Sequence, residues 1–139
     1  MFLIKNLISA FSMFSALPMP NIQYNEKNTK YMMAFFPFIG LTLGAFIFFW
    51  IEICQKLCLG NIFLSLGIVI IPPVISGFIH LDGFMDTLDA LASHGTKEKM
   101  LSIMKDSHVG AFAVIGLLIY FFLYFAICYE LEKSQKTII

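Results

Sequence analysis

Three aspartates with helical spacing stand in one short stretch of the sequence, H-L-D-G-F-M-D-T-L-D-A-L (His80–Leu91). Asp82, Asp86 and Asp89 follow one another at intervals of four and three residues, so on a helix they project from one face. Carboxylates stacked in this way repel one another, so a cation is expected to compensate them. Mg²⁺ prefers oxygen ligands and combines one or two carboxylates with water and substrate phosphate oxygens. The pattern predicts a Mg²⁺ site for a diphosphate; the alternative is a solvated acidic turn with its leucines buried.

A second polar group follows at S-I-M-K-D-S-H-V-G (Ser102–Gly110). Lys105 is expected to pair with a phosphate, and Asp106 to orient this contact or join the metal shell. The alternative interpretation is an ordinary polar loop before the next apolar segment. His80 stands two residues before Asp82 and would point away from the carboxylates on a continuous helix, so it is not a preferred ligand.

The composition indicates a protein that needs lipid to cover much of its surface. Hydrophobic residues make up 59 % of the chain and charged residues 13 %, and the mean hydropathy is +0.84. Soluble domains carry about 25 % charged residues, and a chain of 139 residues cannot bury this much apolar surface by itself. The lysines are scattered and arginine is absent, which argues against nucleic-acid binding. We expect an all-α, polytopic integral membrane protein that forms a single membrane domain over residues 1–139.

The apolar segments that would position these residues fall into three predicted transmembrane helices and one embedded N-terminal helix. The predicted spans are residues 31–53, 62–81 and 109–129. The N-terminal segment, residues 1–20, is expected to be embedded without crossing, because Pro18 and Pro20 stop its helix. A polar connector, residues 21–30, follows it. Pro72 and Pro73 predict that the second span kinks or breaks.

Residues 82–108 form the predicted site loop, with a solvated helix start at residues 97–99. Gly40 and Gly44 have a spacing that favours close helix packing, although incidental glycines in a lipid-exposed helix explain it equally well.

The lysines divide unequally between the two sides that this topology predicts. The side with the site loop carries six: Lys5, Lys27, Lys30, Lys97, Lys99 and Lys105. The other side carries three: Lys56, Lys133 and Lys136. The positive-inside rule therefore places the site loop on the cytoplasmic side of the cell membrane.

With these motifs in place, the sequence resembles the cobalamin synthase family, adenosylcobinamide-GDP ribazoletransferase. Four stretches match in order: F-S-A-L-P-M-P (Phe14–Pro20), F-F-P-F-I-G-L-T-L-G (Phe35–Gly44), H-L-D-G-F-M-D-T-L-D-A-L (His80–Leu91) and M-K-D-S-H-V-G (Met104–Gly110). The first two are loose, whereas the H-L-D-G-x-x-D-T-x-D core followed by K-D-S-x-x-G is highly specific. Together they cover nearly the whole chain.

The resemblance implies a membrane transferase of late cobalamin biosynthesis that joins adenosylcobinamide-GDP to α-ribazole, or to its 5′-phosphate, and releases GMP. It also implies Mg²⁺ as cofactor. The functional residues that carry over are Asp82, Asp86, Asp89, Lys105 and Asp106. Family members are longer, so the chain corresponds to their N-terminal part. We expect it to need a C-terminal half or another subunit for efficient turnover.

Two other functions are compatible with a membrane protein that carries spaced aspartates. A CDP-alcohol-type phosphotransferase also uses them, but its D-G-x-x-A-R pattern needs an arginine, which this sequence lacks. A non-catalytic membrane fragment or subunit that binds Mg²⁺ or a partner without turnover is the other alternative.

Overall fold

The structure is a computed structural model that describes residues 2–20 and 31–138. Within these residues every regular element is a helix, which confirms the predicted all-α class. The chain divides into two compact units, Met1–Gly77 and Phe78–Ile139. The predicted polar connector at residues 21–30 lies outside the described residues.

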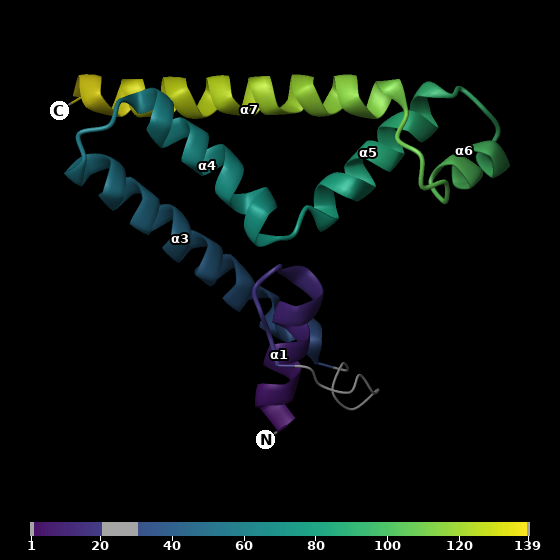
Figure 1. Cartoon of the computed structure of the whole chain (residues 1–139), viewed down its shortest axis with the longest axis horizontal. Coiled ribbons are helices and arrows are strands. Elements are labelled where there is room, and N and C mark those ends of the chain that lie inside the picture. Colours follow the sequence, from purple (N-terminus) through teal and green to yellow (C-terminus); the bar gives the residue numbers. More distant parts are fainter. Residues whose placement is uncertain (1, 21–30, 139) are drawn as a thin grey trace. The chain divides into compact units, whose positions relative to one another are not determined.

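The first unit contains a helical pair that packs closely around one glycine. Its elements are α1 (Phe2–Phe14), the short 3₁₀ helix η1 (Met32–Phe35), α3 (Phe36–Lys56) and α4 (Asn61–Ile75). Helices α3 and α4 lie side by side (Figure 1). The indole of Trp50 on α3 fills the space where a Cβ of Gly67 would stand. Its Nε1 donates to the carbonyl oxygens of Phe63 and Leu64, at 3.3 and 3.2 Å, so the one polar atom of the indole is paired within this apolar contact.

The predicted break in the second span is present, but it follows the prolines by several residues. Pro72 and Pro73 lie inside the last turn of α4, which ends at Ile75. Gly77 and Phe78 then adopt positive φ angles of 66° and 63°, a left-handed conformation that ends a helix. The carbonyl of Ile75, which has no partner within the helix, accepts from the backbone N–H of Ala16 at 2.8 Å. The predicted span at residues 62–81 is therefore two helices.

The second unit packs two helices against each other in antiparallel fashion. Its elements are α5 (Ile79–Ala92), the short α6 (Lys97–Ile103) and α7 (Ala111–Ile138). The ring centroids of Phe84 and Tyr120 lie 5.5 Å apart, and Leu88 contacts the backbone side of Gly116. Phe84 contacts Tyr120, whereas Leu88, which comes later in α5, contacts Gly116, which comes earlier in α7. The two helices therefore run antiparallel, as Figure 1 shows.

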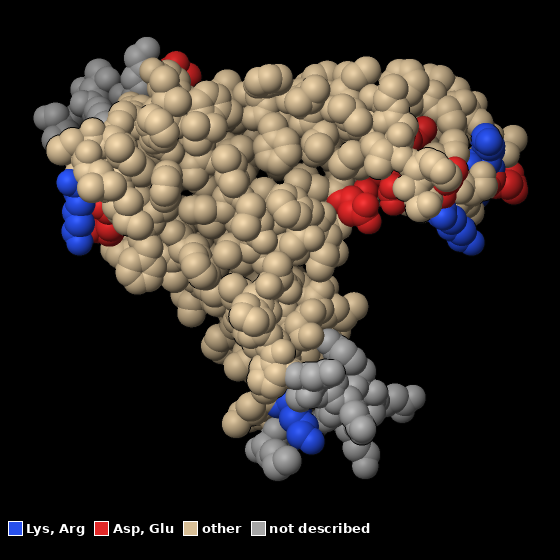
Figure 2. Space-filling model, viewed as in Figure 1, with Lys and Arg blue, Asp and Glu red and all other residues tan. Residues whose placement is uncertain are grey.

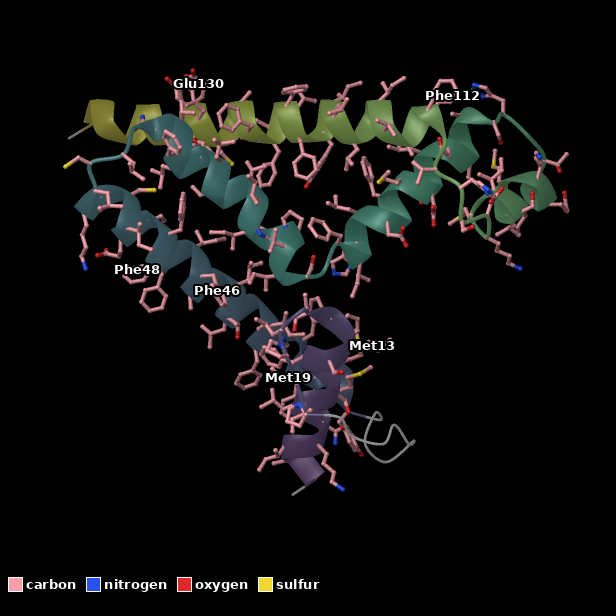
Figure 3. All side chains as sticks on the ribbon, viewed as in Figure 1. Met13, Met19, Phe46, Phe48, Phe112 and Glu130 are labelled. Carbon is pink, nitrogen blue, oxygen red and sulfur yellow. The ribbon has the colours of Figure 1, made fainter. Side chains whose placement is uncertain are left out.

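Two described helices are long and apolar enough to cross a membrane, Met32–Lys56 and Ala111–Leu131. Helices α4 and α5 together give a third candidate if the broken pair counts as one span, so the structure supports two or three spans. Only 11 % of each apolar window is buried, and Phe46 and Phe48 point away from the ribbon of α3 (Figure 3). These surfaces are suited to lipid.

Two of the predicted segments are more helical than expected. The apolar span Ala111–Leu131 agrees with the predicted span at residues 109–129 to within two residues at each end, but helix α7 continues to Ile138. The residues after Tyr129 are mostly glutamate, lysine, leucine and glutamine, which are good helix formers and extend the helix past its apolar part. The site region at residues 82–108 is largely helical, because it contains most of α5 and all of α6.

Candidate functional site

Helix α5 carries all three aspartates of the first motif. At 3.6 residues per turn, Asp82, Asp86 and Asp89 lie within an arc of about 60° around the helix axis. Asp82 is exposed, whereas Asp86 and Asp89 are partly covered. The apolar face of the same helix, with Phe84 and Leu88, contacts α7. Because Phe84 and Leu88 lie on the opposite side of the helix, the edge of α5 that carries Asp82 and Asp86 points away from its contact with α7.

Asp89 is bound to the first turn of α7. Its Oδ2 accepts from the backbone N–H of Gly110 at 2.7 Å, and its Oδ1 accepts from the backbone N–H of Ala113 at 2.8 Å. These contacts join the first sequence motif directly to the end of the second. A carboxylate has about four acceptor positions, so two of those on Asp89 are occupied by α7.

The second motif forms the turn between α6 and α7. Asp106 Oδ1 lies 2.5 Å from Nδ1 of His108 and accepts from the His108 backbone N–H at 3.1 Å. The hydrogen bonds from His108 lower the pKa of Asp106, and the hydrogen bond to Asp106 raises the pKa of His108. Both side chains are exposed, so solvent screens this ion pair. Lys105 stands in the same turn with an exposed side chain.

The helix start that the sequence predicts at residues 97–99 is present. Thr96 is the N-cap of α6, and its hydroxyl accepts from the backbone N–H of Lys99 at 3.4 Å. Red and blue side chains gather over the end of the second unit that holds α5 and α6, while most of the visible surface of α7 is uncharged (Figure 2). Among the side chains that the structure describes in this unit, the charged groups are therefore concentrated beside the aspartate helix.

A surface hollow of about 420 Å³ lies next to these groups. Its lining includes Asp89, Ser93, Asp106, His108, Gly110 and Phe112. Two predicted site residues, Asp89 and Asp106, thus share one hollow, whereas Asp82, Asp86 and Lys105 are not among its lining residues.

The carboxylates of this region differ in how well they fit Mg²⁺. Among residues 2–20 and 31–138, no group of three or more histidine, cysteine, aspartate or glutamate side chains is arranged to hold a metal ion. Asp82 and Asp86 are one helical turn apart, and neither carboxylate has a hydrogen bond or ion pair with another described residue. Two neighbouring carboxylates without side-chain partners fit Mg²⁺, because this ion keeps several waters and takes further oxygens from substrate phosphates.

The sequence matches one family of known proteins along nearly its whole length. The model of the cobalamin-5-phosphate synthase family matches residues 6–139 of the chain. The chain belongs to this family. No solved structure matches it.

Curated members of the cobalamin-5-phosphate synthase family are similar along almost the whole chain. An adenosylcobinamide-GDP ribazoletransferase of Lachnoclostridium phytofermentans is 40 % identical over 98 % of this chain and 52 % of its own length. One from Clostridium botulinum is 40 % identical over 97 % of this chain and 54 % of its own length. One from Fusobacterium nucleatum is 33 % identical over 95 % of this chain and 50 % of its own length. The chain spans about half the length of the curated relatives it matches.

The sequence analysis did not predict two contacts of this chain, that of Asp106 with His108 and that of Asp89 with Gly110. The spacing of Asp106 and His108 is that of an Asx turn, in which an aspartate accepts from the backbone two residues later, so the sequence did contain a signal for this pair. The contact of Asp89 with Gly110 has no local signal, because it joins residues that are 21 positions apart.

Proposed function

We propose that this chain carries the metal-binding half of an adenosylcobinamide-GDP ribazoletransferase. The reaction would join adenosylcobinamide-GDP to the hydroxyl of α-ribazole, or of its 5′-phosphate, and release GMP. Membership of the cobalamin-5-phosphate synthase family supports this proposal. The single observation that carries it is the pair of unpartnered carboxylates, Asp82 and Asp86, on one edge of α5.

The proposed cofactor is Mg²⁺, held by Asp82 and Asp86. When bound, it would neutralise charge on the diphosphate of the substrate. Asp89 was also predicted as a ligand, but both of its oxygens accept hydrogen bonds from the start of α7, so the proposed ligands are Asp82 and Asp86 alone. Lys105 is exposed and free to turn toward a phosphate oxygen. Asp106 holds His108 beside the hollow and thereby orders the turn that carries Lys105.

Metal binding is tested with Mn²⁺, a spectroscopically visible substitute for Mg²⁺, titrated into the purified chain in detergent. Asp86→Asn keeps the shape of the side chain but removes its charge. Loss of a direct ligand should weaken Mn²⁺ binding at least tenfold, since the loss of outer-shell partners alone costs about 10- to 100-fold. The matched control is Glu130→Gln, which also removes one carboxylate charge. Glu130 and Phe112 lie toward opposite ends of α7, so this control is distant from the start of the helix (Figure 3). Equal affinities in all three proteins would contradict the metal site.

Turnover is tested by release of GMP from adenosylcobinamide-GDP in the presence of α-ribazole. The chain is assayed alone and together with a separately expressed C-terminal half of the Lachnoclostridium relative. Release that requires Mg²⁺, is abolished by EDTA and is lost in Asp86→Asn supports the proposal. Absence of release in both mixtures would favour the alternative of a non-catalytic membrane subunit.

We also propose that α5 and α6 face the cytoplasm from a cell membrane, as the lysine distribution suggests. The test is labelling of two single-cysteine variants in intact cells: one keeps only the native Cys58, and the other has all native cysteines replaced and carries Glu98→Cys. Cys58 is exposed between α3 and α4, and Glu98→Cys stands on α6. If the chain crosses the membrane once between Cys58 and residue 82, as the predicted span at residues 62–81 requires, Cys58 is labelled from outside and Glu98→Cys only after permeabilisation. Labelling of both from the same side would show that the chain does not cross between them.

A further inference from the structure

The first turn of α7 lacks a capping side chain of its own. The first N–H groups of any α-helix have no acceptor within the helix. Usually a serine, threonine, aspartate or asparagine at the N-cap accepts from the N–H two or three residues later. In α7 the N-cap position is Gly110, which has no side chain, and the third helical residue is Ala113. The N–H of Ala113 is therefore left for a residue from elsewhere.

Asp89 supplies that acceptor from the neighbouring helix. One carboxylate oxygen binds the N–H of Ala113 and the other binds the N–H of Gly110, at 2.8 and 2.7 Å. A carboxylate is well suited to this place, because the N-terminal end of a helix carries a partial positive charge. Hydrogen bonds to a charged acceptor are also stronger than those between neutral groups. Asp89 thus acts as an N-cap for α7 although it belongs to α5.

The contact requires glycine at position 110. A Cβ added there would lie 2.5 to 2.6 Å from the carboxyl carbon and both oxygens of Asp89, far inside van der Waals contact. Ala113, the second donor, is 1 % exposed, so water does not readily replace the carboxylate there. One turn further along α7, Gly116 gives similar room to Leu88 of α5.

We propose that Asp89 is a positioning residue, which, with Gly110 as its receptor, fixes the metal-binding edge of α5 relative to the Lys105–His108 turn. The turn leads directly into Gly110, and the Asp82–Asp86 edge lies on the same helix as Asp89. One capping contact therefore sets the spacing between the two sequence motifs and forms one wall of the hollow that also contains Asp106 and His108. The functional consequence rests on the proposed phosphotransfer, whereas the contact itself does not.

The contact is tested by amide NMR and hydrogen exchange on the full chain in detergent micelles. Asp89→Asn removes the charge and one of the two acceptor oxygens. We expect the amide resonances of Gly110 and Ala113 to move and the Ala113 amide to exchange about tenfold faster, as for loss of a hydrogen bond to a charged group. Gly110→Ala should have the same effect through collision. The control Gly83→Ala, on α5 with open space around its Cβ, should leave both amides unchanged. Unchanged amides in Asp89→Asn would overturn the proposal.

A second arm separates a positioning residue from a metal ligand. Mn²⁺ affinity should fall at least tenfold in Asp86→Asn, but stay within about twofold of the wild type in Asp89→Asn and Gly110→Ala. Equal loss of Mn²⁺ affinity in Asp89→Asn and Asp86→Asn would make Asp89 a ligand and overturn the proposal. If the wild type binds no Mn²⁺, the proposed function fails, while the amide experiment still reports on the contact.

A third arm separates positioning from stability alone. In the double variant Asp89→Ala with Gly110→Ser, the new hydroxyl caps α7 from its own N-cap position, in the space that the carboxylate has left. The thermal midpoint and the protection of Ala113 should return toward wild-type values. GMP release, measured with the C-terminal half present, should stay reduced because the hydrogen bonds that fix α5 against the end of the Lys105–His108 turn are still missing. Full recovery of GMP release together with the midpoint would show a purely structural role.

Discussion

The two helix pairs of this molecule, α3 with α4 and α5 with α7, are both closed by a glycine that admits a large neighbour, but the neighbours differ in chemistry. In the first pair the neighbour is the indole of Trp50 against Gly67. In the second it is the carboxylate of Asp89 against Gly110, followed by Leu88 against Gly116. The first pair holds an uncharged ring, and the second holds a charge at the end of a helix.

The difference follows from where an acceptor or donor can be found. Most side chains along α3 and α4 are apolar, and the indole N–H binds the backbone carbonyls of Phe63 and Leu64. A charge there would lack partners. At the start of α7, backbone N–H groups are unpaired by the nature of a helix end, and a carboxylate satisfies them. Small residues thus make close packing possible in both pairs. A carboxylate is accommodated only in the second pair, where N–H groups at the start of a helix bind it.

The largest effect should come from Gly67→Ala in the first pair. The added Cβ overlaps the rigid indole of Trp50, which is also held by its hydrogen bonds. Forcing extra volume into a well-packed contact costs typically about 1–3 kcal/mol. We expect a lower thermal midpoint in detergent and an altered fluorescence of Trp50, the single tryptophan. In a background of Trp50→Ala the same substitution should cost much less, because the two residues are coupled. Equal costs in both backgrounds would show that the indole does not occupy this space.

A smaller effect is expected for Gly116→Ala in the second pair. Here the added Cβ meets the Cδ1 atom at the flexible end of Leu88, which can rotate away more easily than an indole. The cost should fall at the low end of the overpacking range, about 1 kcal/mol. Thermal denaturation of the two glycine variants side by side provides the measurement. A larger loss for Gly116→Ala than for Gly67→Ala would contradict the view that the α3–α4 contact is the more rigid one.

The parts of this fold that follow from local sequence were predictable, and those that depend on helix register were not. The apolar runs, the weakness around Pro72 and Pro73 and the start of α6 after Thr96 are all encoded within a few residues. The G-x-x-x-G pair at Gly40 and Gly44 was equally compatible with close packing and with incidental glycines in a lipid-exposed helix, and a Cβ at either position meets nothing within 4 Å. Gly67 makes the close contact instead. A pattern of small residues shows that a neighbouring helix could pack closely. The residue at which it does so depends on the position of that neighbouring helix.

The same distinction explains the candidate site. The spacing of Asp82, Asp86 and Asp89 correctly implied one helix face, because that depends on a local period. It could not show that Asp89 lies beside the start of α7, because the pairing of α5 with α7 depends on contacts such as Phe84 with Tyr120, 36 residues apart. The assignment of the three aspartates to Mg²⁺ stays a prediction.

Gly40→Ala should have a small effect of the opposite sign. The substitution lies inside α3 with open space around the new Cβ. Alanine loses less conformational freedom than glycine on entering a helix, which is worth about 0.5–1 kcal/mol. The thermal midpoint of this variant should therefore equal or slightly exceed that of the wild type. A clear loss of stability would show that the surface at Gly40 is occupied in the folded protein, and would reverse the contrast with Gly67.

The smallest effect concerns the exposed pair Asp106 and His108 and appears as a pH dependence. The hydrogen bond to Asp106 raises the pKa of His108, so its contribution is complete below the ordinary histidine value of about 6.5 and is lost as the pH rises through the raised pKa. The hydrogen bonds from His108 lower the pKa of Asp106, so that contribution is complete above the ordinary aspartate value of about 3.9 and is lost as the pH falls through the lowered pKa. The pair is therefore most favourable between about pH 4 and 6.5. NMR titration of the His108 ring should give a lower midpoint in Asp106→Asn than in the wild type, and added salt should narrow the difference. Identical midpoints would show that the turn before α7 is not held by this pair, which would leave the contact of Asp89 with Gly110 as the charged contact that orders it.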